Sequence, residues 1–323
     1  YFLQEFLVSP FIRRGDIVLF PSEYNRQLYR HFFPASITDE NSMVCHPLPA
    51  AKPKRHHWKV HRKNKDIKLG WLGRISREKN FGVALEIFKM LSSVSACRLY
   101  LCGPVQPEYH LKFQKLLNQT PKNIAKNIIH LGQGKMVNKK EGYNFFKNID
   151  LLLFPSVASM ESLGRVIIEA SCFDVPVIAA NYAATPELIP EKYLAKVKYK
   201  AGTYDFYKVY SLGKPDVKRM VELCLRFSGK RGEFIFNAYD YSYKKLTDVL
   251  TSDFSNKQHQ SSLHAAHMIK NVDIFIPGFN FKKEETVEKA IRYLGKNEIS
   301  DIALTPVLIA EHLNFHPYFK IKK

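Results

Sequence analysis

Between residues 150 and 180 the sequence alternates apolar runs with a polar loop and a helix. The first run, 150–154, is followed by Pro155, which is typical of a buried parallel strand that ends at the carboxyl edge of a sheet. The segment 166–173 has an apolar helical face, and a second apolar run begins after Pro176. A strand, a loop, a helix and a strand in this order predict an α/β fold with a parallel sheet, which binds ligands at its carboxyl edge.

The polar loop of this unit suits a phosphorylated nucleotide. The first turn of a helix leaves backbone amides unpaired at the positive end of the helix dipole, so Ser162, Leu163 and Gly164 can hold a diphosphate. Glu161 and Glu169 flank this turn. Glu169 could accept two hydrogen bonds from a ribose diol, and a carboxylate in an otherwise apolar helix is costly unless it has partners. Glu161 is also explained by helix capping alone.

A second loop, earlier in the chain, supplies positive charge. The apolar strand through Trp71 ends at Gly73, which frees the turn so that Arg74 and Lys79 can converge on a phosphate. The alternatives are a surface ion pair for Arg74 and a solvated helix start for Lys79. We favour phosphate binding because both residues follow a glycine at a strand end.

With these motifs the chain resembles the retaining glycosyltransferases of family four, also described as glycosyl transferases group 1. Their GT-B fold has two facing Rossmann-like domains, each a parallel sheet with helices on both faces. The resemblance extends from about Asp16 to about Leu250. Its motifs, in chain order, are Gly73-Arg74 with Lys79, the segments 99–103 and 128–132, Pro155-Ser156, Glu161 with Glu169, and the segments 176–179 and 186–189.

The resemblance assigns a role to each candidate site residue. It implies that Arg74 and Lys79 bind the donor diphosphate, that Glu161 contacts the transferred sugar and that Glu169 holds the ribose. The catalytic residues would be Glu161, Arg74 and Lys79, and a hexose would move from a UDP-sugar or GDP-sugar to a glycan or lipid-linked acceptor with retention. We expect that no metal is required, because the cations and amides stabilise the leaving diphosphate.

Two other classes of function stay open at this point. One is a non-catalytic fragment that binds a nucleotide sugar or docks on a membrane. The other is a nucleotide-sugar epimerase of the same fold, which would act without an acceptor. The Arg74 and Lys79 pair together with the Glu161 and Glu169 spacing favours the transferase.

The sequence departs from the family pattern in three places. The usual aromatic residue of the acidic loop is Leu163, and the usual glycine before the 176–179 strand is replaced by Asp174 with Val175, which predicts a different helix ending. The glycine-rich loop and the histidine of the family's first domain are not identifiable. We therefore expect most of an amino-terminal domain to be lacking, which puts in question whether this chain is active alone.

The predicted organisation has four parts. Residues 1–50 form a remnant of the amino-terminal, acceptor-side domain, and 51–66 form a basic linker. Residues 67–250 form the Rossmann-like donor-binding domain. Residues 251–323 form a carboxy-terminal α/β extension to which we assign no role. Within the donor domain, Trp71, Phe81 and His130 are expected in the core rather than in the site.

The charge of the chain indicates a partner. The formal net charge is +19, and basic clusters at 52–68, 122–140 and 196–200 could hold the protein on an anionic membrane surface. The alternative is that these side chains are simply solvated. Nucleic-acid binding is not expected, because the aromatic residues lie in apolar segments and no known module is present.

The predicted location is cytoplasmic, with a peripheral position on the inner face of the membrane. No apolar run reaches the roughly twenty residues that a membrane helix needs. The five cysteines are scattered and odd in number, as in buried, reduced thiols. The family resemblance adds polysaccharide or lipopolysaccharide biosynthesis as the expected setting.

Overall fold

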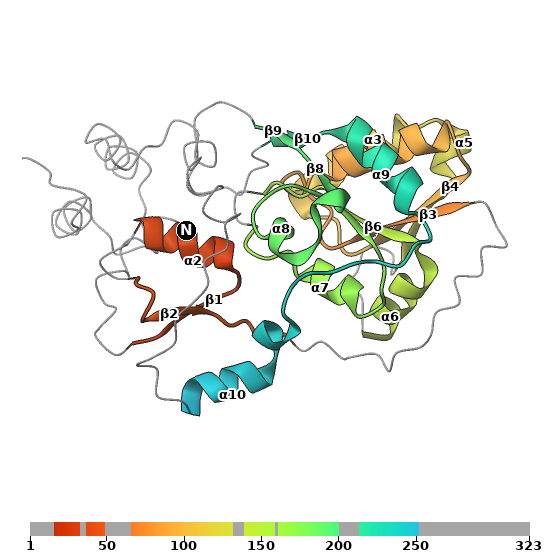
Figure 1. Cartoon of the computed structure of the whole chain (residues 1–323). Helices are drawn as coiled ribbons and strands as arrows, with labels where there is room; N and C mark the ends of the chain where they lie inside the picture. Colours follow the sequence, from red (N-terminus) through yellow and green to blue (C-terminus); the bar gives the residue numbers. More distant parts are fainter. Residues whose placement is uncertain are drawn as a thin grey trace, which may run out of the picture.

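The computed structural model describes residues 16–32, 37–48, 66–131, 139–158, 161–199 and 213–251. These residues form a large unit built on one sheet and a smaller amino-terminal unit beside it (Figure 1). The proposed basic linker and carboxy-terminal extension fall on 51–65 and 252–323, outside the described residues. The domain boundaries therefore stay a prediction.

The sheet of the large unit is parallel, as the apolar runs predict. Its strands lie in the order β5-β4-β3-β6-β7-β8, and every neighbouring pair is parallel. The chain order thus reverses between β3 and β6, as in a Rossmann fold. The strand bounds are β3 (Ile67–Leu72), β4 (Cys97–Cys102), β5 (Ile128–Leu131), β6 (Leu151–Phe154), β7 (Val177–Ala180) and β8 (Leu194–Ala195).

Helices cover both faces of this sheet (Figure 1). One face carries α3 (Phe81–Ser92) and α9 (Val217–Phe227), and the opposite face carries α6 (Lys139–Asn148) and α7 (Arg165–Ser171). The α/β class and the Rossmann-like sheet are therefore confirmed. The remaining elements are short: η2 (Pro107–Tyr109), α4 (His110–Asn118), α5 (Lys122–Ala125), α8 (Thr185–Leu188), η4 (Glu191–Tyr193), and the antiparallel pair β9 (Val197–Tyr199) and β10 (Gly213–Pro215).

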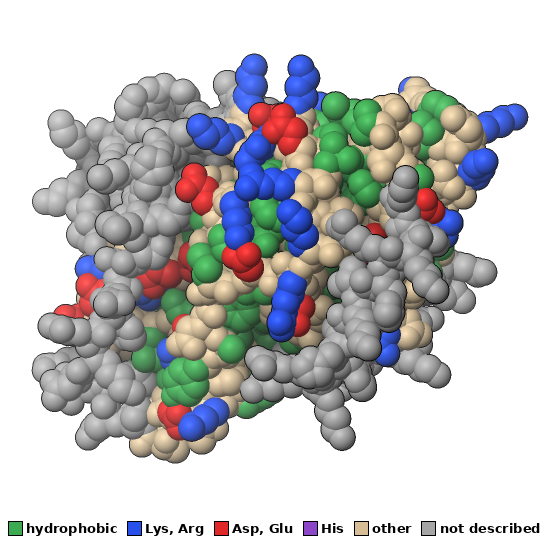
Figure 2. Space-filling model, turned by 45° about the vertical axis from the view of Figure 1, so that its right-hand side comes forward, with side chains coloured by type: hydrophobic (Ala, Val, Ile, Leu, Met, Phe, Trp, Pro, Cys, Tyr) green, Lys and Arg blue, Asp and Glu red, His purple; other side chains and the backbone are tan. Residues whose placement is uncertain are grey.

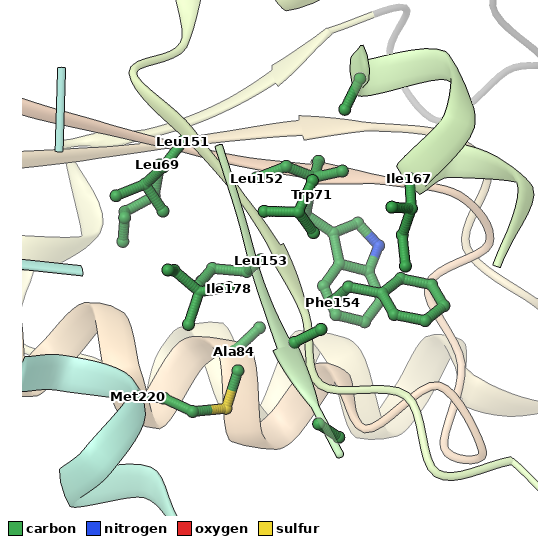
Figure 3. Close-up of a cluster of buried hydrophobic side chains, with 14 of the residues drawn as sticks. Leu69, Trp71, Ala84, Leu151, Leu152, Leu153, Phe154, Ile167, Ile178 and Met220 are labelled. Carbon is green, nitrogen blue, oxygen red and sulfur yellow. The ribbon is translucent and has the colours of Figure 1, made fainter. Parts of the chain in front are cut away.

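The core lies between the sheet and these helices. In Figure 3, Trp71 of β3 lies near Phe154 of β6 and Ile167 of α7, and Met220 of α9 closes the other face. Trp71 meets Phe81 edge-on, with ring centroids 5.5 Å apart. Both rings are buried, at 4% and 0% exposure, so both belong to the core, although Trp71 also lines the pocket described below.

His130 also has the structural role expected of it. It lies on β5, and its Nε2 forms a hydrogen bond of 2.9 Å with the Gly103 carbonyl. Its ring packs against Phe113 at 6.1 Å between centroids. A histidine whose ring is satisfied in this way needs no ligand to explain it.

The helix before the 176–179 strand ends differently from the family pattern, as the replacement of glycine by Asp174 predicts. Asp174 takes the left-handed conformation, with φ 52°, that glycine would adopt most easily. The Val175 N–H then returns to the Ala170 carbonyl at 3.2 Å, and the Asp174 carboxylate pairs with Arg231 at 2.8 Å. An acidic residue thus serves where the family uses glycine.

The amino-terminal unit is a strand, helix and strand: β1 (Val18–Phe20), α2 (Glu23–Phe32) and β2 (Ser42–Val44). The two strands pair in parallel, with α2 as the crossover between them. Arg26 of α2 is only 1% exposed and binds Glu23 at 2.8 Å and Asp39 at 2.9 Å. This ion-pair network holds the helix against the segment that leads into β2.

The last described helix returns to the amino-terminal unit, as the resemblance implies. The turn η5 (Ala238–Tyr241) precedes α10 (Tyr243–Thr251). The N–H groups of His46 and Leu48, which follow β2, donate to the Asp240 and Tyr241 carbonyls of η5, both at 3.0 Å. The segment 238–251 is thus a 3-10 turn followed by a separate helix.

All five cysteines are free thiols, four of them buried and Cys172 partly so. Among the described residues, no helix has both the length and the apolar character that crossing a bilayer demands.

Candidate functional site

A pocket of about 210 Å³ opens at the carboxyl ends of β3 and β6, where the strand order reverses. Loops that leave neighbouring strands in opposite directions create a crevice at this point of an open α/β sheet. The pocket is lined by residues of three segments: His46; Trp71, Leu72, Gly73, Arg74 and Lys79; and Leu153, Phe154, Pro155, Ser156 and the turn 161–166.

Two glycines set the path of the loop after β3. Gly73 has φ +128° and Gly103, after β4, has φ +141°. A Cβ on Gly103 would come within 2.2 Å of the Gly73 carbonyl oxygen, so only glycine permits this approach. The Gly73 N–H also donates to the Cys102 carbonyl at 2.9 Å. The loop is thereby fixed, and Arg74 is exposed at the pocket.

Asn80 connects this loop to the one after β6. It takes the left-handed conformation, with φ 60°, just before α3, which asparagine tolerates better than most residues. Its side-chain Nδ2 donates to the Pro155 carbonyl at 3.0 Å. This contact holds Lys79 next to the acidic loop. The motif around Lys79 includes Asn80, but its sequence gives no sign of this role.

Lys79 and Glu161 form an ion pair in the pocket. Their Nζ and Oε2 atoms lie 2.5 Å apart, and the side chains are 26% and 9% exposed. The Ser156 hydroxyl donates to the same Glu161 oxygen at 2.6 Å. Two of the three predicted catalytic residues, Lys79 and Glu161, are therefore in direct contact although they are far apart in the sequence.

The turn 162–164 presents its backbone to the pocket. Gly164 has φ +78°, and a Cβ there would meet Ile167 Cδ1 at 3.1 Å and the Phe154 ring at 3.3 Å. Within the described part of the chain, the N–H groups of Ser162, Leu163 and Gly164 donate to no acceptor. Because α7 has only seven residues, these local amides matter more than its dipole.

Leu163 as a whole is only 3% exposed, and its side chain belongs to the hydrophobic core.

Besides Arg74 and Lys79, the pocket contains a third cationic side chain, that of Arg165. Arg165 follows Gly164, lines the pocket and is exposed, as is Arg74. Neither guanidinium forms an ion pair with a carboxylate of the described residues. Three cations and one carboxylate therefore surround the pocket, which favours an anionic ligand. The position of Arg165 at a helix start after glycine is a signal that sequence reasoning could have used.

Glu169 lies apart from the other predicted residues. It is on α7, one turn beyond Arg165, and is not among the residues that line the pocket. Burial raises the pKa of the Glu169 carboxyl above its usual value, and Arg165 partly offsets this. The structure thus brings Arg74, Lys79, Glu161, Ser162, Leu163 and Gly164 together and leaves Glu169 a turn away. Its ribose-binding role stays a prediction.

His46 is a pocket residue to which the sequence analysis gave no role, and it falls within the predicted remnant 1–50. It comes from the segment after β2 and lines the pocket. Burial and the positive charge of Arg165 lower the pKa of its imidazole, which favours the neutral ring. A histidine directly after a predicted strand end was the available signal.

In the ranges that the structure describes, no three His, Cys, Asp or Glu side chains are grouped so that they could hold a metal ion.

Residues 53–201 match the family model of glycosyl transferases group 1. A curated Klebsiella pneumoniae protein, the "uncharacterized 41.2 kDa protein in cps region", is 30% identical over 125 residues, which is 39% of this chain and 30% of that protein. The chain therefore matches less than a third of this relative's length.

Solved structures are also similar to this chain. One is the carboxy-terminal domain of a glycosyl transferase group 1 family protein from Francisella tularensis, with 23% identity and a TM-score of 0.36 over 49% of this chain and 80% of that one. Another is Anabaena HepE in complex with UDP and glucose, with 15% identity and a TM-score of 0.44 over 74% and 64%. The resemblance to group 1 glycosyl transferases is confirmed over residues 53–201. Family four and retention stay predictions.

Proposed function

From the match of residues 53–201 to the glycosyl transferases group 1, we propose that the chain transfers a hexose from a UDP-sugar or GDP-sugar with retention of configuration. One observation carries the proposal. Arg74, Lys79 and the unpaired amides of the turn 162–164 meet in one pocket beside the Glu161 carboxylate. This is the arrangement that a diphosphate attached to a sugar requires.

The chemistry needs positive charge at the leaving group. As the bond from the anomeric carbon to the diphosphate oxygen breaks, its electron pair stays on the diphosphate. Arg74, Lys79 and the amides of Ser162, Leu163 and Gly164 stabilise this charge, so that no metal is required. The acceptor oxygen attacks from the same face, and its proton passes to the departing phosphate oxygen.

Binding of the donor would break the ion pair between Lys79 and Glu161 and so rearrange the site. In the free protein Lys79 is held by Glu161, and the phosphate of the donor would compete for the Lys79 ammonium. Glu161 would then be released toward the hydroxyls of the sugar while Ser156 keeps one of its oxygens in place. Glu161 thereby orients the transferred sugar.

We assign the ribose to Glu169. The residue is one helical turn beyond Arg165, which lines the pocket, and is itself outside the pocket lining. A nucleotide whose diphosphate lies on the turn 162–164 would extend along α7 toward this carboxylate. Burial of Glu169 supports a role that needs a partner for its charge.

The acceptor we propose is a glycan or a lipid-linked intermediate of polysaccharide or lipopolysaccharide synthesis. The Klebsiella relative's name places that protein in a cps region, and the formal charge of this chain is +19. Figure 2 shows Lys and Arg gathered in a band on one face, with Asp and Glu between them. Such a surface supports the proposal that the enzyme is cytoplasmic and binds peripherally to an anionic membrane.

Calorimetric titration with nucleoside diphosphates and their sugars tests the proposal. We expect micromolar binding of one nucleotide, weakened in Glu169→Ala by about 1–3 kcal/mol, the effect of losing hydrogen bonds to a charged group. Glu222→Ala is the matched control, because Glu222 is an exposed residue of α9 that pairs with Arg219. A folded protein that binds none of these ligands would contradict the proposal.

Product analysis separates the two alternative functions. A nucleotide sugar altered in the absence of any acceptor would indicate an epimerase. Binding without transfer to any glycan or lipid-linked acceptor would indicate a binding protein.

A further inference from the structure

The amino-terminal unit touches the turn that presents the amides. Ser22, between β1 and α2, is fully buried, and its hydroxyl donates to the Ser162 carbonyl at 2.8 Å. The same oxygen accepts the Asn25 N–H at 3.2 Å, which caps the start of α2. A serine hydroxyl has one hydrogen, and the Ser162 contact is shorter than the 3.2 Å contact with Asn25 Oδ1. Ser22 therefore joins α2 to the site.

The contact fixes the direction of one amide. In a trans peptide the C=O and N–H of the same unit point in opposite directions. Holding the Ser162 carbonyl toward Ser22 thus turns the Leu163 N–H the other way. Both residues line the pocket, and the Leu163 N–H has no acceptor within the described ranges. The amide therefore points away from Ser22 and is not used by the described residues.

A second contact holds Ser22 itself in place. Glu187 of α8 accepts the Glu23 N–H through Oε2 at 2.9 Å and the Tyr24 N–H through Oε1 at 2.6 Å. These are the first two amides of α2, which would otherwise lack partners. Glu187 and Ser162 both belong to the large unit, and both form hydrogen bonds with the amino-terminal end of α2.

We propose that Ser22 is a positioning residue of the diphosphate site, which orients the Leu163 amide toward the ligand, and that Glu187 anchors it. The inference rests on the proposed function, since it assumes that the turn 162–164 binds a diphosphate. Through Ser22, the amino-terminal unit helps to orient the donor site.

The test uses the full chain, Ser22→Gly and the control Ser93→Gly, in which an exposed serine at the end of α3 is changed. Glycine is tolerated at a helix N-cap, so Ser22→Gly removes the hydroxyl with little effect on α2. We expect affinity for UDP, GDP and inorganic pyrophosphate to fall about five- to tenfold, as for one misdirected hydrogen bond. Amide hydrogen exchange in 161–166 of the free protein should become faster.

Glu187→Gln gives an independent variant. Its amide group offers only one acceptor oxygen for two N–H groups, so we expect the same changes as in Ser22→Gly but smaller. Unaltered affinity and unaltered exchange in Ser22→Gly, with normal binding by the wild type, would overturn the positioning role and leave the proposed function intact. A wild type that binds none of the three ligands would overturn both.

Discussion

Lys79 and Glu161 neutralise each other in the free protein, so variants of the two residues should have opposite effects on nucleotide binding. Lys79→Met removes a phosphate ligand and should weaken nucleoside diphosphate binding about 10- to 100-fold, the usual range for a hydrogen bond to a charged group. Glu161→Gln frees the Lys79 ammonium and should leave that binding equal or tighter, while transfer falls on the order of 100-fold. Calorimetry and a transfer assay measure the two quantities.

Lys192→Met is the control for this pair. Lys192 forms an ion pair of the same 2.5 Å length with Glu233, but both side chains are exposed and outside the pocket. Its loss should change neither binding nor transfer. Equal weakening of nucleotide binding in Lys79→Met and Glu161→Gln would mean that the pair is structural.

His46 makes the binding of an anion sensitive to protons. Its pKa is lowered by burial and by Arg165, and a diphosphate beside Arg165 would cancel the second effect. Binding near pH 6–7 should therefore be accompanied by proton uptake, which His46→Gln abolishes while weakening affinity roughly fivefold. Calorimetry in buffers of different ionisation enthalpy measures the uptake. The same uptake in His46→Gln would assign the proton to another group.

At the scale of elements, the loop after β3 depends on the glycine after β4. Gly103→Ala would push its Cβ into the Gly73 carbonyl, in a backbone conformation that alanine rarely adopts. We expect a loss of about 2–4 kcal/mol in the free energy of unfolding and weaker nucleotide binding, because Arg74 moves with the loop. Chemical denaturation and calorimetry check the two effects.

Gly82→Ala is the matched control, since a Cβ at this position of α3 meets nothing within 4 Å. Replacing a helical glycine by alanine should stabilise the protein by about 0.5–1 kcal/mol. If Gly103→Ala unfolded and bound nucleotide like the wild type, the close approach of the two loops would not matter for the site.

The elements that were predicted well are those whose signal is local. Continuous apolar runs predicted β6 and β7, because strands buried on both faces are apolar throughout, and the apolar residues around Trp71 predicted β3. Gly73 and Gly164 predicted the turns, because glycine tolerates the positive φ angles that these turns have. From these turns the sequence also predicted which loops meet at the carboxyl edge.

The contacts that were missed join residues far apart in the sequence. Asn80 reaches Pro155, Ser22 reaches Ser162, and His46 enters the pocket from another unit. Each of these residues has an ordinary local explanation as a turn, a cap or a linker. Only the three-dimensional arrangement shows that the contacts converge on one site.

For the molecule as a whole, one of the contacts between the two units is made by a group that titrates. Glu187 accepts two N–H groups of α2, and burial raises the pKa of its carboxyl from 4.5 to about 7 despite these donors. Between these two values the folded protein binds more protons at Glu187 than the unfolded chain does. The stability that Glu187 contributes is therefore complete below pH 4.5 and is lost as the pH rises toward and through 7.

The measurement is the free energy of unfolding by urea from pH 4.5 to 8, in the wild type and in Glu187→Gln. The difference between the two proteins should fall with rising pH by at most about 1.4 kcal/mol per pH unit, the slope for one proton. Comparing the two cancels Glu169, whose raised pKa acts in the same direction, and His46, whose lowered pKa acts in the opposite one. A constant difference across this range would show that Glu187 keeps its usual pKa, and that the junction of the two units does not respond to protons. If the difference in unfolding free energy falls with rising pH, the contact of Glu187 with α2 becomes less stable near neutral pH. The reason is that the Glu187 carboxylate, which anchors Ser22, must then be buried as a charge.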